Sequence, residues 1–329
     1  MEKIQGIDMT NVVYVFGYGA FGTSITYALN FNIDNQVFVY DKKFLISEKK
    51  WEEYNIQERT GIDTSRIKST SIINFVENSY IFLVIPSMSI DSWVKENKQY
   101  VNDSNIIVNL AKGFSDKGTL IIDNLEKEFP KNKIFTIKGP SFANEILRGY
   151  PTLLTIAGRY GDLHLEHLIN LFKNSNLVFE YSSDYKGIEV LSVLKNIYSI
   201  FIGIVNAKYD AANTTFLSFT KAFKEMEILL TIYGGDSKSL LSSAGIGDFG
   251  LTGLNDMSRN RTFGLFVGKG FYDKRNKHSI LVEGTRSIEI VHNKALNAGC
   301  LTKLPILSFL YSLFFKDGEI NDLNKILYA

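Results

Sequence analysis

The chain has 329 residues, of which 45% are hydrophobic and 22% charged, the composition of a soluble globular protein. This length exceeds one ordinary hydrophobic core and predicts two domains. The formal net charge of +1 gives no electrostatic reason to expect a nucleic acid or an anionic membrane as partner, and the single cysteine, Cys300, excludes an internal disulfide framework.

The N-terminus carries no apolar signal segment. The longest apolar runs, 197–205 and 304–315, are shorter than the roughly 20 residues that a membrane helix needs, so we expect no membrane span. A lone cysteine fits a reducing compartment, and we expect a cytoplasmic protein.

The first predicted strand, 11–17, is an apolar run that ends in a glycine-rich turn. Gly17, Gly19 and Gly22 form G-x-G-x-x-G between this strand and a helix, and the second strand ends in Asp41, about 20 residues further on. In such a turn the first glycine allows the tight bend, the second lets the backbone approach a pyrophosphate, and the third lets helix and strand pack closely. The N-terminus of the helix offers unpaired N–H groups to the phosphates. The context favours a dinucleotide site over a glycine turn of another strand–helix unit.

The rest of the first half alternates strand-like and helix-like segments. Further strands are predicted at 36–41, 80–86, 106–110, 133–138, 152–157 and 177–181, and helices at 89–100, 118–128 and 162–173. This alternation is typical of an α/β Rossmann domain, a doubly wound and mostly parallel sheet with helices on both faces. Ligands of such sheets bind beyond the carboxyl ends of the strands, where 85–87, 110–113 and 138–143 would lie.

From about Tyr185 the pattern becomes helical, with helices predicted at 186–207, 211–233, 282–298 and 306–315. Segment 188–205 is apolar on nearly every side, so it should run through the middle of a helical domain. We expect the domains to be 1–184 and 185–329, with the active site in the cleft between them.

Lys195 lies inside this apolar helix, where an unpaired ammonium would be costly. A half-buried lysine has a lowered pKa and can donate a proton near neutral pH. The sequence leaves a second interpretation open, in which Lys195 extends to solvent at the edge of the helix.

Segment 245–264 is a second polar island, and the glycines at 245, 247, 250 and 253 make an ordinary helix unexpected around Asp248. Ser258, Arg259 and Asn260 offer hydroxyl, guanidinium and amide donors that suit a phosphate or a carboxylate. An exposed loop before a helix capped by Ser258 explains the same residues equally well.

Lys112 ends a predicted strand, where a cofactor or substrate phosphate would reach it. The spacing of His164 and His167 suits one helix face, but no constellation of carboxylates or thiolates lies near them, so we expect a solvated helix face and no metal site.

Seven short blocks occur in one order along the chain: G-Y-G-A-F-G (17–22), A-K-G (111–113), G-P-S-F-A-N-E (139–145), L-K-N (194–196), G-I-G-D (245–248), S-R-N-R-T-F-G (258–264) and V-E-G (282–284). In this ordered set the sequence resembles the bacterial-type NAD(P)-dependent glycerol-3-phosphate dehydrogenases over nearly its whole length. The resemblance implies a Rossmann domain followed by an all-α domain of the 6-phosphogluconate dehydrogenase-like type. It implies the reversible reduction of dihydroxyacetone phosphate to sn-glycerol 3-phosphate for phospholipid synthesis, with NAD(H) or NADP(H) as cofactor. It also makes a homodimer an expectation.

The resemblance implies roles for individual residues. Lys195 would polarise the ketone and protonate the forming alkoxide, while Asp248 and Thr252 would orient the reacting end and Lys112 would contact both substrate and cofactor. The substrate-binding residues that it implies are Lys112, Gly139, Ser141, Asn196, Asp248, Ser258, Arg259 and Asn260. The cofactor-binding residues that it implies, beside the three glycines, are Ala20, Phe21, Lys112, Ala143, Arg259 and Glu283.

Asp41 and Lys42 stand where this family commonly has a small residue and then Arg or His. An aspartate here accepts hydrogen bonds from the ribose 2′-hydroxyl and repels a 2′-phosphate, so the sequence predicts a preference for NAD(H), with Lys42 able to compensate in part for NADP(H). Two other functions remain open: a two-domain dehydrogenase for another small phosphorylated ketone or hydroxy acid, and a cofactor-binding sensor without turnover.

Overall fold

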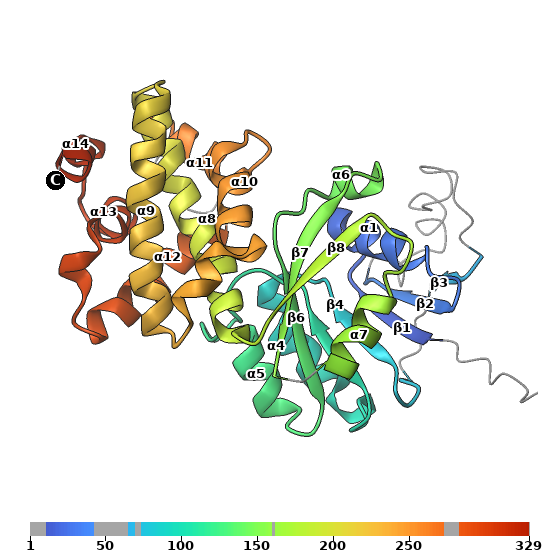
Figure 1. Cartoon of the computed structure of the whole chain (residues 1–329). Helices are drawn as coiled ribbons and strands as arrows, with labels where there is room; N and C mark the ends of the chain where they lie inside the picture. The colour runs from blue at the N-terminus through green and yellow to red at the C-terminus, as the bar shows by residue number, and fades with distance from the viewer. Residues whose placement is uncertain (1–10, 43–64, 70–73, 160–161, 273–282, 329) are drawn as a thin grey trace, which may run out of the picture.

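The computed structural model describes residues 11–42, 65–69, 74–159, 162–272 and 283–328. A twisted sheet with helices on its faces takes up the N-terminal half, and the C-terminal half packs beside it as helices alone (Figure 1). The predicted fold class, an α/β Rossmann part followed by an all-α part, is confirmed.

The sheet of the described residues has eight strands in the order β3-β2-β1-β4-β5-β6-β7-β8. Neighbouring strands are parallel except for β6 and β7, which pair antiparallel. The strands are β1 (Asn11–Phe16), β2 (Asn35–Tyr40), β3 (Ile67–Ser69), β4 (Tyr80–Leu83), β5 (Ile106–Asn109), β6 (Lys133–Lys138), β7 (Thr152–Gly158) and β8 (Leu177–Ser182). The sequence predicts all of them but β3, whose three residues are too few to show a period.

Both faces of the sheet are buried, which explains the unbroken apolar runs of its strands. Side chains alternate across a strand, so Val13 and Val15 of β1 pack in one core while Tyr14 and Phe16 pack in the other. The helices that cover the sheet are α1 (Ala20–Leu29), α4 (Ile90–Asn97), α5 (Ile121–Glu128), α6 (Ala143–Leu147) and α7 (Asp162–Asn170).

The helical half is built around α8 (Tyr185–Lys208). Every residue of α8 from Gly187 to Val205 is buried, as the apolar pattern predicts. By length and composition α8 could span a membrane, but its whole apolar stretch is covered by the protein, so it is a core helix. The surrounding helices are α9 (Ala212–Ile232), α10 (Asp248–Leu254), α11 (Arg259–Gly268), α12 (Glu283–Asn297), α13 (Pro305–Phe315) and α14 (Leu323–Tyr328). The sequence predicts that α12 begins at Val282, which lies outside the described residues.

The expectation that the glycine-rich segment 245–264 avoids ordinary helix is wrong. A π-helical turn at Ser243–Gly247 leads directly into α10, and α11 follows after a short loop. Glycine costs about 1 kcal/mol in a helix interior, but here it permits close packing against α8: a Cβ on Gly253 would lie 2.9 Å from Cδ1 of Ile202. Tertiary contact therefore outweighs intrinsic propensity in this segment.

Two glycines also set the distance between α8 and α11. A Cβ on Gly203 would lie 2.2 Å from the carbonyl oxygen of Arg261, and one on Gly264 would lie 2.1 Å from that of Ile200. Because no side chain separates the two backbones, the first turn of α11 lies directly beside the middle of α8. This contact brings Asn260 to Asn196.

Candidate active site

The glycine turn after β1 has the geometry of a dinucleotide cradle. Gly17 has φ +97°, and a Cβ there would lie 2.5 Å from the carbonyl oxygen of Val84. A Cβ on Gly22 would lie 1.9 Å from the carbonyl oxygen of Gly17, so α1 and β1 pack as closely as the fingerprint predicts. A Cβ on Gly19 would meet nothing within 4 Å, which leaves backbone open for a pyrophosphate to approach. These residues fit the predicted cofactor.

Asp41 fastens this turn to the end of β2. Its Oδ2 accepts a hydrogen bond of 2.7 Å from the backbone N–H of Tyr18. No side chain caps α1 at Gly19, so the N–H groups of its first turn remain available to phosphate oxygens.

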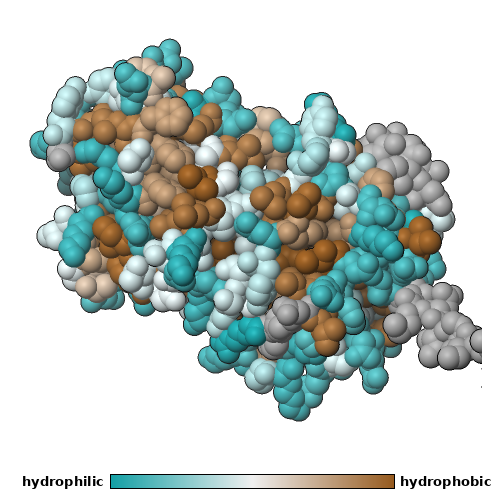
Figure 2. Space-filling model, in the orientation of Figure 1, coloured by the Kyte–Doolittle hydropathy of each residue, from teal (hydrophilic) through white to brown (hydrophobic). Residues whose placement is uncertain are grey.

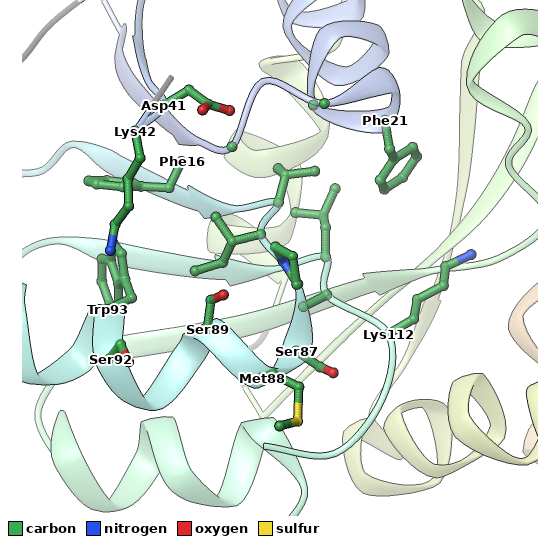
Figure 3. A pocket seen from close by; sticks show the side chains of 18 of the residues that line it. Phe16, Phe21, Asp41, Lys42, Ser87, Met88, Ser89, Ser92, Trp93 and Lys112 are labelled. Carbon is green, nitrogen blue, oxygen red and sulfur yellow. The ribbon is translucent and has the colours of Figure 1, made fainter. Parts of the chain in front are cut away.

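A cavity of about 710 Å³ opens beyond the carboxyl ends of β1, β2, β4 and β5, where the sequence places the ligand. This volume is that of a typical small-ligand site. Figure 3 shows Phe21 and Lys112 at one end of the cavity and Asp41, Lys42 and Trp93 at the other. The predicted residues that line it are Gly17, Gly19, Phe21, Gly22, Asp41, Lys42, Lys112, Ser141, Arg259 and Glu283. The predicted site residues that are not part of its wall are Ala20, Gly139, Ala143, Lys195, Asn196, Asp248, Thr252, Ser258 and Asn260.

Lys112 and Lys195 share one buried carboxylate. The Lys195 ammonium donates to Asp248 Oδ1 at 2.6 Å and to the Thr252 hydroxyl at 3.1 Å, while the Lys112 ammonium donates to Asp248 Oδ2 at 3.0 Å. Lys195 is 5% exposed and Asp248 1% exposed. The interpretation in which Lys195 extends to solvent is therefore wrong.

The electrostatics of this triad make Lys195 the group that can release a proton. Burial lowers the pKa of Lys195 to about 7, and the nearby charge of Lys112 adds to the effect while Asp248 opposes it. Burial disfavours the charged form of Asp248, yet Lys112 and Lys195 outweigh it and hold the pKa of this carboxyl below its usual value. With both lysines protonated the triad carries a buried net positive charge; after Lys195 loses its proton, Asp248 and Lys112 remain as a balanced pair.

Lys112 is also tied to the loop after β6. Its ammonium donates to the carbonyl oxygen of Gly139 at 3.0 Å and lies 3.3 Å from the Ser141 hydroxyl. Gly139 has φ +140°, which a side chain would strain. The blocks 111–113 and 139–145 thus meet at one lysine.

The first turn of α11 carries the predicted phosphate ligands. Ser258 is the N-cap of α11, as the sequence allows: its hydroxyl accepts from the Arg261 N–H at 3.3 Å. Asn260 donates to Asn196 Oδ1 at 3.0 Å, which joins this turn to α8. Arg259 extends from the same turn into the cavity wall.

Ser87 belongs to segment 85–87, which the sequence places at the ligand edge of the sheet, and its hydroxyl lies 3.4 Å from Glu283 Oε1 across the two halves of the molecule. Other residues of the cavity have no signal in the sequence. Trp93 and Glu96 line the far end of the cavity from α4, where the amphipathic pattern predicts only a helix. Glu96 lies 3.4 Å from the Lys42 ammonium.

An enzyme that reduces a carbonyl group needs a dinucleotide site and a proton donor beside it. Lys112 lies at one end of this cavity, and its partner Asp248 also binds the Lys195 ammonium, so a proton donor lies next to the dinucleotide site. By fold and site the protein is an NAD(P)-dependent oxidoreductase. Family models give the particular group: residues 12–162 match the N-terminus of the NAD-dependent glycerol-3-phosphate dehydrogenases and residues 184–325 match the C-terminus. The chain belongs to this family.

Individual relatives agree with the family. The chain is 28% identical to a glycerol-3-phosphate dehydrogenase [NAD(P)+] of Halothermothrix orenii, over 97% of this chain and 95% of that protein. It is 27% identical to the protein of that name in Methanothermobacter thermautotrophicus, over 94% and 95%. Its fold is similar to the crystal structure of glycerol-3-phosphate dehydrogenase from Coxiella burnetii, with a TM-score of 0.82 and 22% identity over 98% of this chain and 99% of that chain.

Proposed function

We propose that this protein catalyses the reversible reduction of dihydroxyacetone phosphate to sn-glycerol 3-phosphate, the step that supplies the glycerol backbone of phospholipids. The observation that carries the proposal is the buried Lys112–Asp248–Lys195 triad at the end of a dinucleotide cavity, in a chain of this family. A bound nicotinamide supplies the hydride to the carbonyl carbon.

Lys195 donates the proton that the reaction needs. As the hydride reaches the carbonyl carbon, negative charge develops on the oxygen, and the Lys195 ammonium stabilises this charge and then transfers a proton to it. Asp248 and Thr252 hold the ammonium in place through their hydrogen bonds. Lys112, at the cavity wall and paired with Asp248, contacts both substrate and cofactor.

The substrate phosphate binds at the first turn of α11. Arg259 offers a bidentate guanidinium, and Asn260 and Asn196 offer amide groups on the side that faces α8. The remaining substrate contacts are those of Ser258, the N-cap of α11, and of Gly139 and Ser141 beside the Lys112 ammonium. A phosphate therefore sits on the helical half while the dinucleotide sits on the sheet.

We assign residues 1–184 to the cofactor-binding domain and 185–329 to the helical domain, since β8 ends at Ser182 and α8 begins at Tyr185.

We also propose that the protein acts in the cytoplasm as a homodimer. Figure 2 shows hydrophobic side chains gathered over the face that carries α9, where Phe216 is 59% exposed and Leu217 42% exposed. For a homodimer we expect light scattering to give a mass close to twice the 37.2 kDa of one chain.

The reaction is tested by the loss of NADH absorbance when purified protein meets dihydroxyacetone phosphate, with unphosphorylated dihydroxyacetone and NADPH in parallel. Fast oxidation with the phosphorylated ketone alone supports the reaction and the phosphate site together. If NADH binds but is not oxidised, dihydroxyacetone phosphate is not the substrate, and other small ketones and hydroxy acids are then screened. A protein that binds NADH and turns over none of them is a sensor.

A further inference from the structure

A second buried ion pair lies close to the triad. The Lys138 ammonium, at the end of β6, lies 3.0 Å from Glu189 Oε1 near the start of α8. Their side chains are 0% and 1% exposed. Neither residue lines the cavity, and neither belongs to the blocks that indicate the family.

The Lys138 ammonium has a full set of acceptors. Besides Glu189 it donates to the carbonyl oxygen of Ala111 at 2.5 Å and to that of Asn109 at 3.4 Å. Glu189 Oε1 in turn accepts from Asn109 Nδ2 at 2.7 Å and from the Thr136 hydroxyl at 2.5 Å. The pair thus joins β5, β6 and α8 through side-chain contacts and through two backbone carbonyl groups.

Each backbone segment that the pair contacts continues to a residue of the triad or to one of its hydrogen-bond partners. Ala111 precedes Lys112, and Lys138 precedes Gly139, whose carbonyl oxygen accepts from the Lys112 ammonium. Glu189 lies on α8, the helix that carries Lys195. The two lysines that must reach the same carboxylate therefore come from backbone segments whose separation the pair sets.

Stability alone does not explain a charged pair at this position. Desolvation of two charges offsets much of their attraction, and well-packed apolar residues of similar volume commonly serve a fold equally well. Glu189 Oε2 is buried and accepts no hydrogen bond from any described residue, a further cost to the folded state. Burial also lowers the pKa of Lys138.

We propose that Lys138 and Glu189 form a positioning pair for the ketone-reducing site, which sets the separation of the β5–Lys112 segment and α8 so that Lys112 and Lys195 both reach Asp248. The inference rests on the proposed function for its effect on turnover. The pair touches neither substrate nor cofactor and acts through the triad.

The test variant carries Lys138→Met and Glu189→Gln together in the full-length chain. Both charges are removed at nearly constant volume, and the glutamine oxygen still accepts from Asn109 and Thr136. Lys138→Met alone leaves a carboxylate buried without its ammonium and destabilises the fold, which is why the double variant is needed. Glu225→Gln is the matched control, because Glu225 is a buried, hydrogen-bonded carboxylate of the helical half without contact to the triad.

The double variant keeps a melting temperature and an NADH affinity close to those of the wild type, while kcat for dihydroxyacetone phosphate reduction falls roughly 10- to 100-fold, the usual effect of losing groups that orient a site. The pH–rate profile shifts with it, and Glu225→Gln shifts neither. Unchanged kcat and an unchanged pH profile overturn the proposal, and so does an equal loss of kcat in the control.

A second measurement does not need the substrate. The Cε resonance of Lys195 in lysine-labelled protein, assigned with Lys195→Arg, reports the titration of this ammonium in the wild type and in the double variant. A displaced titration supports the pair, and a coincident one overturns it. If the wild type does not reduce dihydroxyacetone phosphate, the proposed function fails, while this titration still decides the role of Lys138 and Glu189.

Discussion

At the scale of single residues, burial decides the chemistry. Lysine in water is protonated far above neutral pH, and Lys195 becomes a proton donor near pH 7 only because α8 is covered on every side. The Asp248 carboxylate opposes this effect, because it accepts a hydrogen bond from the Lys195 ammonium and stabilises its charged form. The charge of Lys112 lowers the pKa of Lys195 further.

Ketone reduction requires protonated Lys195, so we expect kcat to fall as pH rises above about 7, and kcat of the reverse oxidation to rise over the same range. Lys195→Met removes the donor and lowers kcat by about 10²- to 10⁴-fold, while NADH binding measured by fluorescence titration stays near that of the wild type. A Lys195→Met protein with unaltered turnover, or a wild type whose rate is flat from pH 6 to pH 9, contradicts this role.

Asp41 is expected to make NADH the better cofactor, by at least about tenfold in kcat/KM, because a carboxylate at the end of β2 repels a 2′-phosphate. Lys42, whose ammonium is 3.4 Å from Glu96, points away from Asp41 in Figure 3. Asp41→Ser narrows the difference between the two cofactors, and Lys42→Ala leaves kcat/KM for NADH unchanged. Equal values for the two cofactors in the wild type would show that the prediction is wrong.

At the scale of elements, side chains of one helix complete the ends of another. Glu225 of α9 accepts hydrogen bonds from the N–H groups of Ile306 and Leu307 at 2.6 and 3.1 Å, so it satisfies the first turn of α13 from a distance in sequence. Tyr198 of α8 donates to the same carboxylate at 2.9 Å. Three helices therefore meet at one buried acid.

Burial raises the pKa of Glu225 from 4.5 to about 7, although the two N–H groups and the Tyr198 hydroxyl favour its charged form. The folded state then binds the proton more tightly than the unfolded state. The contribution of this group to stability is complete below about pH 4.5 and is lost as pH rises through 7, on the order of 3 kcal/mol in all. Melting temperatures measured from pH 5 to pH 8 should fall more for the wild type than for Glu225→Gln. Parallel curves contradict the assignment.

At the scale of the whole molecule, the cavity exists because two differently built halves meet. The sheet supplies the glycine turn and the helical half supplies Arg259 and Glu283. Arg286 of α12 connects the two halves. Its guanidinium donates to the carbonyl oxygens of Ser115 and Asp116 at 2.7 and 2.6 Å, a few residues after Lys112 in the chain.

Arg286→Ala removes the guanidinium donor from both carbonyl groups, of which that of Ser115 still accepts from the N–H of Gly118, and loosens the segment that follows Lys112 from α12. We expect the Kd for NADH to rise roughly 3- to 10-fold and the melting temperature to fall, because hydrogen bonds to a charged group are worth about 1.5–3 kcal/mol each. Glu289→Ala, an exposed change on the same helix, is the control for both quantities. An Arg286→Ala protein that matches this control would show that the join does not depend on Arg286.

Local patterns in the sequence are sufficient for the Rossmann half. Apolar runs, turn glycines and the aspartate that ends β2 act within about 30 residues of chain, and each depends on backbone geometry that its own residues impose. The buried helix around Lys195 is also evident from its composition. Short elements are not, as β3 illustrates, because three residues carry no period.

The sequence by itself determined the sheet, the cradle at Gly17–Gly22 and the central position of α8, since these follow from hydrophobic periodicity and from glycine stereochemistry. Only the tertiary structure decided that segment 243–254 forms a π-turn and a helix, because packing against α8 outweighs helix propensity there. It also decided that Lys195 is buried against Asp248, 53 residues away, and that Lys138 meets Glu189. Charges so distant in sequence leave no local pattern, and their partners are set by how the two halves pack.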